Sequence, residues 1–158
     1  MHESSGSDEL VDAVLRSSRA LVAVAARSIA QVDDAVTLPQ YRALIVLAAH
    51  GPRRVTDLAD ELGVHPSSAT RMCDRLERAG LVDRAVAVGN RREVEVRLTR
   101  PGRALLDRVT AARRGEIARI VKDVPASLRS AMVKGLQTFS DAAGEVPDQA
   151  WAAGWDLP

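Results

Sequence analysis

The chain has 158 residues, enough for one compact domain or for two small ones that share a core. Its 22 Lys and Arg residues nearly balance 21 Asp and Glu residues, so the net charge of +1 indicates no particular partner. Hydrophobic residues make up 46% of the chain but aromatic residues only 3%, which favours helices packed on helices and argues against an aromatic-rich barrel or sandwich.

Other classes of protein are excluded by the cysteine content and by the distribution of apolar residues. A single cysteine, Cys73, excludes an intramolecular disulfide framework and any metal site made of several cysteines. The N-terminus lacks the basic start and apolar run of a secretory signal. No segment reaches the ~18 uninterrupted apolar residues of a membrane span. We therefore expect a cytoplasmic protein with no membrane partner.

Two helices are predicted before residue 52. The first spans residues 8–31, where Ser7 has the position of a capping hydroxyl and apolar side chains recur at near-helical spacing. Thr37 and Gln40 have the spacing of a capping box, which predicts that a second helix begins after Thr37. Gly51 is a typical residue at a helix end, so we expect the second helix to end there.

Two shorter helices follow, joined by a tight turn. Thr56 is a candidate cap for a helix over residues 57–62, and Gly63 is expected to end that helix. Pro66 suits the first position of the next helix, because the N–H group that proline lacks has no partner there. This second short helix is predicted to run to Ala79.

The pattern then changes to short stretches that favour β-strands. Residues 81–87 and 93–99 are predicted strands, the second because apolar and charged residues alternate along it. Residues 88–92 lie between them, contain glycine and charge, and are predicted to form the hairpin tip. Two more helices are expected, one after the cap Thr99 and one from Pro125.

The order helix, turn, helix, two-stranded ribbon is that of a winged helix-turn-helix. The later of these two short helices, predicted from Pro66 to Ala79, has an apolar stripe that would pack on the earlier one. It also has short polar side chains near its start, which permit close approach to base edges. Between residues 63 and 92, six arginines face three carboxylates, a local excess of three positive charges. The simpler alternative is an ordinary exposed helix with alternating charges.

Residues 55–103 resemble the DNA-binding lobe of the MarR family of bacterial transcriptional regulators. The shared features are LADELGV at 58–64, S-x-x-T-R-x-x-D-R-L-E-x-x-G-L-V at 67–82 and V-x-V-x-LT-x-x-G at 94–102. The resemblance implies a mainly α fold, in which a winged helix-turn-helix with a two-stranded β wing is flanked by dimerisation helices. It also implies a homodimer that binds a near-palindromic operator in double-stranded DNA, as a repressor that responds to a small ligand.

The resemblance divides the chain into four parts. An N-terminal dimerisation helix covers 8–36, the DNA-binding lobe 37–103, the C-terminal dimerisation helices 104–144, and a tail 145–158. No nucleophile–base pair, phosphate-binding loop or carboxylate dyad is recognisable, so we expect neither an enzyme nor a cofactor.

The resemblance also implies which side chains contact DNA. The residues at major-groove positions are Ser67, Ser68, Thr70 and Arg71, with Arg75 at a phosphate or groove-edge position. The residues at minor-groove positions in the wing are Asn90, Arg91 and Arg92. The family's D-x-R is N-x-R here, and the usual proline before the wing tip is absent, so the rigidity of the wing is open.

Several other residues have two interpretations each. Arg16 and Arg19 lie near the place where family members hold anionic aromatic ligands, and either bind an anionic or phenolic effector or form salt bridges and extend to solvent. Cys73 belongs to the apolar stripe of the second short helix, so we expect it to pack there rather than sense oxidants. Trp151 and Trp155 either anchor the tail or cover a ligand.

No metal site is expected, because the three histidines have neither the spacing of a ligand pair nor a carboxylate cluster between them. Two further functions fit the same winged-helix residues. One is a module that binds another protein instead of DNA, and the other is an architectural DNA binder without sequence preference.

Overall fold

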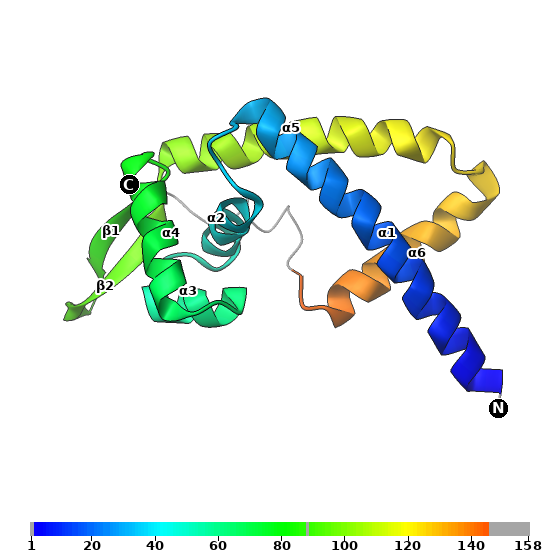
Figure 1. The fold of residues 1–158 in the computed structure, drawn as a ribbon, viewed down its shortest axis with the longest axis horizontal. Coiled ribbons are helices and arrows are strands. Elements are labelled where there is room, and N and C mark those ends of the chain that lie inside the picture. The colour runs from blue at the N-terminus through cyan, green and yellow to red at the C-terminus, as the bar shows by residue number, and fades with distance from the viewer. Residues whose placement is uncertain (1, 88, 146–158) are drawn as a thin grey trace.

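The computed structural model describes residues 2–87 and 89–145, and these contain six helices and one two-stranded sheet. The elements are α1 (His2–Val32), α2 (Leu38–His50), α3 (Val55–Leu62), α4 (Pro66–Arg78), β1 (Val82–Ala87), β2 (Asn90–Leu98), α5 (Arg100–Lys122) and α6 (Ala126–Ala142). A lobe made of α2, α3, α4 and the sheet lies at one end, and α1, α5 and α6 extend from it as a helical arm (Figure 1). None of these helices is long and apolar enough to span a bilayer.

Most helix ends follow the local sequence signals. The predicted capping box is confirmed: the Thr37 hydroxyl accepts from the Gln40 N–H, and the Gln40 side chain accepts from the Thr37 N–H. Thr99 Oγ1 accepts from the N–H of Gly102 at 3.1 Å and begins α5. Gly63 ends α3 in the left-handed conformation that glycine adopts without strain.

Two of the predicted helix starts are wrong. α1 begins at His2, so Ser7 lies inside it, and the helix predicted over residues 8–31 omits the first six residues of α1. A helix that is already nucleated gains a hydrogen bond with each added residue and needs no capping side chain to continue. α3 begins at Val55, and its N-cap is Arg54 instead of Thr56; the Arg54 guanidinium binds both carboxylate oxygens of Asp57 in the first turn, at 2.9 and 3.0 Å.

The two strands pair antiparallel, with Val82 opposite Leu98 and Val86 opposite Val94. The predicted hairpin tip, 88–92, is too long, because β2 begins at Asn90, which pairs with Ala87. The chain therefore reverses over two residues, of which Val88 lies outside the described part. Such a short reversal needs backbone that only glycine adopts readily, and Gly89 has a φ of 91°.

The core lies inside the lobe and consists of aliphatic side chains. Leu44 of α2, Leu58 of α3, Leu76 of α4, Val96 of β2 and Leu105 of α5 are all buried. Because each element contributes to one cluster, the positions of α4 and of the ribbon are set by the same packing.

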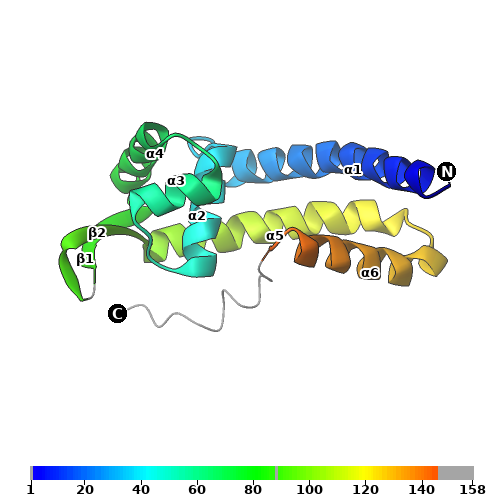
Figure 2. The same ribbon diagram turned by 90° about the horizontal axis from the view of Figure 1, so that it is seen from below.

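The arm leaves much apolar surface uncovered. α1 and α5 pack together near the lobe, where Arg27 pairs with Glu116. In Figure 2, α5 lies between α1 and α6. No residue of α6 is buried. The large apolar side chains exposed on α1 and α6 are Leu10, Val11, Leu15, Leu21, Val22, Leu128, Met132, Val133, Leu136 and Phe139.

Candidate DNA-binding interface

α4 is held by a buried stripe and by a cap at its start. Ala69, Cys73 and Leu76 form the stripe, and α4 packs against α3. His65 caps the helix: its Nδ1 accepts from the N–H of Ser67 at 3.3 Å and lies 2.8 Å from Ser67 Oγ. Since one face of α4 is buried in this way, its opposite face is directed to solvent.

The predicted major-groove residues lie together on this outer face. Four of them are exposed and Ser68 is half-buried; the exposed ones are Ser67, Thr70, Arg71 and Arg75. The Thr70 hydroxyl donates to a backbone carbonyl one turn earlier, at 3.0 Å, so its oxygen is still able to accept a hydrogen bond. Within the described residues, neither Arg71 nor Arg75 forms an ion pair, so both guanidinium groups are available to an anionic partner.

The predicted wing residues are placed by backbone alone. Asn90, Arg91 and Arg92 are the first residues of β2 and follow the reversal directly, while their side chains lie outside the described part of the structure. The ribbon projects from the lobe beside α4 (Figure 1). A helix and a projecting ribbon in this relation are able to contact adjacent grooves of one DNA duplex.

Sequence analysis missed a set of ion pairs between α4 and the ribbon. Arg84 of β1 places Nη2 2.6 Å from Asp74 Oδ1, and its Nη1 binds Glu77 Oε2. The hydrogen bond to Asp74, with the charges of both carboxylates, raises the pKa of Arg84. Across the ribbon, Arg97 pairs with Asp83 at 2.6 Å. All three carboxylates between residues 63 and 92 are therefore paired. Arg71 and Arg75, which have no ion-pair partner among the described residues, dominate the outer face of α4.

Comparison with known proteins settles the family. A model described as "MarR family" matches residues 36–94. The crystal structure of RV1404 from Mycobacterium tuberculosis is 46% identical in sequence, with a TM-score of 0.84, and the match covers 89% of this chain and 96% of that one. The chain belongs to the MarR family.

Two further comparisons agree with this assignment. The HTH-type transcriptional repressor MdtR of Bacillus subtilis is 36% identical over 84 residues, which are 53% of this chain and 54% of MdtR, so the match spans about half of that relative. The apo form of wild-type MarR from E. coli has the same fold, with a TM-score of 0.70 at 21% identity and coverage of 82% of this chain and 96% of that one. This MarR-family protein is a DNA-binding transcriptional regulator with a winged-helix fold.

Cys73 is placed as predicted in this MarR-family chain. Its side chain is 0% exposed, within the core that α4 shares with the rest of the lobe. Burial raises the pKa of the Cys73 thiol, which lowers the fraction of reactive thiolate. The structure therefore favours packing over oxidant sensing.

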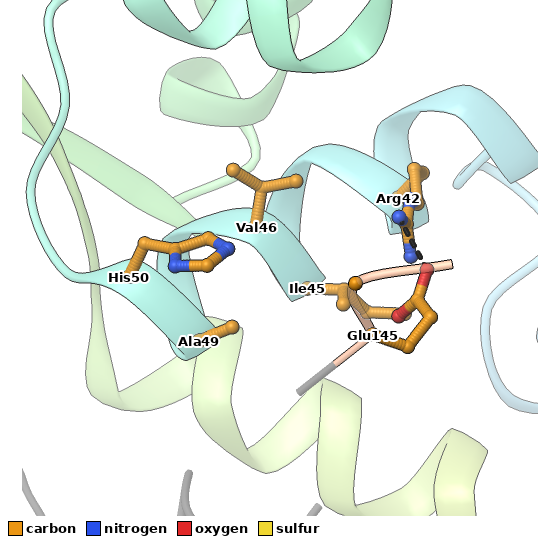
Figure 3. Close-up of a pocket in the computed structure, with 7 residues that line it drawn as sticks. Arg42, Ile45, Val46, Ala49, His50 and Glu145 are labelled. Carbon is orange, nitrogen blue, oxygen red and sulfur yellow. Dashed lines mark hydrogen bonds and ion pairs between the residues drawn. The ribbon is translucent and has the colours of Figure 1, made fainter. Parts of the chain in front are cut away.

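The two arginines that were candidates for effector binding are exposed on α1, three residues apart. Arg16 and Arg19 do not line the small pocket found between α2 and the residues after α6 (Figure 3). That pocket holds about 30 Å³ of free space, enough for about two water molecules and too little for an aromatic acid. Arg42 and Glu145 both line the pocket and form an ion pair, with Nη2 2.6 Å from Oε1. The tail tryptophans, Trp151 and Trp155, lie outside the described residues.

Proposed function

We propose that this MarR-family protein is a homodimeric, ligand-responsive repressor of a near-palindromic operator. The observation that carries the proposal is the outer face of α4, where two arginines without an ion pair in the described part of the chain and short polar side chains lie beside a projecting ribbon. The relative MdtR is described as a repressor, which favours repression over activation.

Each half of the operator would be read by one copy of α4 and one wing. The α4 residues proposed to enter the major groove are Ser67, Ser68, Thr70, Arg71 and Arg75. A guanidinium at Arg71 suits the paired acceptors of guanine, whereas the short hydroxyls permit the helix to approach the base edges. The wing residues Asn90, Arg91 and Arg92 would follow the minor groove, whose negative potential attracts arginine.

The exposed apolar surface of the arm supports the homodimer. Leu136 and Phe139 of α6 are 49% and 53% exposed in the single chain, and α1 exposes further leucines and valines toward its N-terminus. A soluble monomer rarely leaves a helical face of this kind uncovered. A second copy would bury it with the corresponding face of its own arm, and the two α4 helices would then enter successive major grooves about 34 Å apart. In this assembly, 8–36 and 104–144 would be the dimerisation segments and 37–103 the DNA-binding lobe.

An anionic or phenolic effector is proposed to bind in the arm near Arg16 and Arg19. Their guanidinium groups are exposed and form no ion pair within the described residues, so they are able to pair with a carboxylate. A phenolic acid such as salicylate should raise the melting temperature of the wild type but not of the Arg16→Ala/Arg19→Ala variant. The control Arg108→Ala/Arg114→Ala removes two exposed arginines from α5 and should keep the shift. An equal shift in all three proteins would exclude this site.

The operator proposal is tested by DNA binding at several salt concentrations. Duplexes are first selected from a random pool by the wild-type protein, and then compared with scrambled duplexes of equal length and composition. Operator recognition predicts binding at least about a thousandfold tighter to the selected sequence. Equal affinities with a steep salt dependence would show an architectural DNA binder. No binding to either duplex would refute operator recognition and leave a protein-interaction module.

A further inference from the structure

The connection between α4 and the ribbon follows the C-terminal end of α4, whereas most of the residues that would read DNA lie in the first half of the helix. Gly80, with a φ of 72°, follows α4, and its N–H donates to the Glu77 carbonyl at 2.9 Å. Arg71 lies nine residues before this turn, which is about 13 Å along the helix. A rotation of only about 5° at the turn would thus move Arg71 by about 1 Å, enough to spoil the geometry of a base contact.

Arg84 opposes this rotation by joining β1 to the C-terminal half of α4, through Asp74 and Glu77. Asp74 and Glu77 are three residues apart, so their carboxylates lie on the same side of the helix. The guanidinium places one nitrogen on each of them, 2.6 Å from Asp74 Oδ1 in the first case. A planar group held at two points restrains both the distance and the orientation of α4 relative to the strand. The Arg84 side chain is 26% exposed, so solvent screens these bonds less than at a fully exposed site.

We propose that Arg84 is a positioning residue for the DNA-reading helix, acting through Asp74 and Glu77 to keep α4 in register with the wing. The inference rests on the proposed operator recognition and names a residue that does not itself touch DNA. Because both grooves must be entered at once, the angle between α4 and the ribbon decides whether base contacts form. Contacts with phosphates tolerate a shift of this size, because they depend on charge more than on direction. Loss of the brace should therefore reduce sequence discrimination more than overall affinity.

Arg97 provides the matched control. It is also an arginine of the ribbon and also pairs with a carboxylate, since Nε lies 2.6 Å and Nη2 3.1 Å from the oxygens of Asp83. Asp83 and Arg97 are partners across the two strands, so this pair joins only elements that the backbone ladder already holds together. Replacing Arg97 by lysine has the same chemical effect as replacing Arg84, without disturbing α4.

The experiment compares Arg84→Lys with Arg97→Lys on the selected and scrambled duplexes, by fluorescence anisotropy. Lysine keeps the charge but presents a single ammonium in place of the planar fork. We expect Arg84→Lys to weaken binding to the selected duplex by about five- to twentyfold, the effect of about one base contact. Its affinity for the scrambled duplex and the salt slope should stay within about twofold of the wild type, because the formal charge is unchanged. Arg97→Lys should leave both affinities unchanged.

A second variant tests the brace from the opposite side and does not depend on the folding of Arg84→Lys. Asp74→Asn/Glu77→Gln removes two negative charges near DNA, so affinity for the scrambled duplex should rise while the ratio of selected to scrambled binding falls. Three results would overturn the positioning role. Arg84→Lys could lose affinity equally for both duplexes, or Arg97→Lys could lose as much affinity as Arg84→Lys. Asp74→Asn/Glu77→Gln could also keep the wild-type ratio of selected to scrambled binding. A wild-type protein that shows no preference at all would refute operator recognition itself, a result distinct from each of these.

Discussion

The close contact between α5 and the chain that joins α4 to β1 predicts a large effect of adding one methyl group at Gly102. A Cβ atom at this position would lie 2.1 Å from the carbonyl oxygen of Leu81 and 2.8 Å from Leu98 Cδ1. The leucine side chain is able to move, but the carbonyl is backbone and also accepts from the N–H of Thr99 at 3.1 Å. Gly102→Ala therefore has to shift either α5 or the chain between α4 and β1.

The expected magnitude is the balance of three effects. Alanine is favoured over glycine in a helix by about 1 kcal/mol. Forcing an extra carbon into packed structure costs about 1–3 kcal/mol, and loss of the Thr99–Leu81 hydrogen bond costs about another 1 kcal/mol. We expect the free energy of unfolding to fall by about 1–3 kcal/mol. Gly115, in the same helix, has no neighbour within 4 Å of a built Cβ, so Gly115→Ala should raise it by about 0.5–1 kcal/mol.

The assay is equilibrium unfolding in urea at one fixed protein concentration, followed by circular dichroism. The two alanine variants should differ in sign: the midpoint should fall for Gly102→Ala and rise for Gly115→Ala. If Gly102→Ala were as stable as the wild type, the close approach of α5 to the Leu81 carbonyl would be wrong. A fall of equal size in Gly115→Ala would show that the helix tolerates no added methyl group, and the reasoning from one contact would fail.

The other predictions concern the proposed dimer, the Cys73 thiol and the arginines that are proposed to contact DNA. Leu136→Asp should abolish both dimer formation and DNA binding, because the dimer interface would then bury an unpaired charge. If the protein is a monomer, this half-exposed position should change the free energy of unfolding by less than about 0.5 kcal/mol. Analytical sedimentation separates the two cases. Cys73→Ser should still bind DNA with and without peroxide, and its free energy of unfolding should fall by about 1–3 kcal/mol. If peroxide released the wild type from DNA but not this variant, Cys73 would be an oxidant sensor. Arg71→Ala should cost about 1–3 kcal/mol on the selected duplex and relax its sequence preference. Arg92→Ala should weaken binding to the selected and the scrambled duplex alike and lower the salt slope by about one. If Arg92→Ala relaxed sequence preference and Arg71→Ala weakened both duplexes alike, the roles proposed for these two arginines would be exchanged.

Local sequence signals were sufficient for most of the helices and for one face of α4. The cap at Thr37 and the end at Gly63 depend on hydrogen bonds within a few residues, so the residues that decide them are adjacent in the chain. The outer face of α4 follows from its buried stripe, because a period of 3.6 residues places Arg71 and Arg75 opposite Cys73 once the stripe is known. The residues on the outer face of α4 were therefore predictable as a group from the sequence, whereas their contact with the major groove stays a prediction.

Tertiary structure decided the features that join segments distant in the chain. The pairing of Arg84 with Asp74 depends on the angle between β1 and α4, which is set by their common core and not by any local pattern. The approach of Gly102 to the Leu81 carbonyl spans 21 residues, so the sequence showed only a glycine near a helix start. Charge counting treated Arg84 as part of a basic surface, although its charge is used between two acidic side chains. The sequence by itself determined which residues α4 presents to solvent. Packing determined how α4 is held against the wing, because the orientation between two elements depends on contacts that no local pattern encodes.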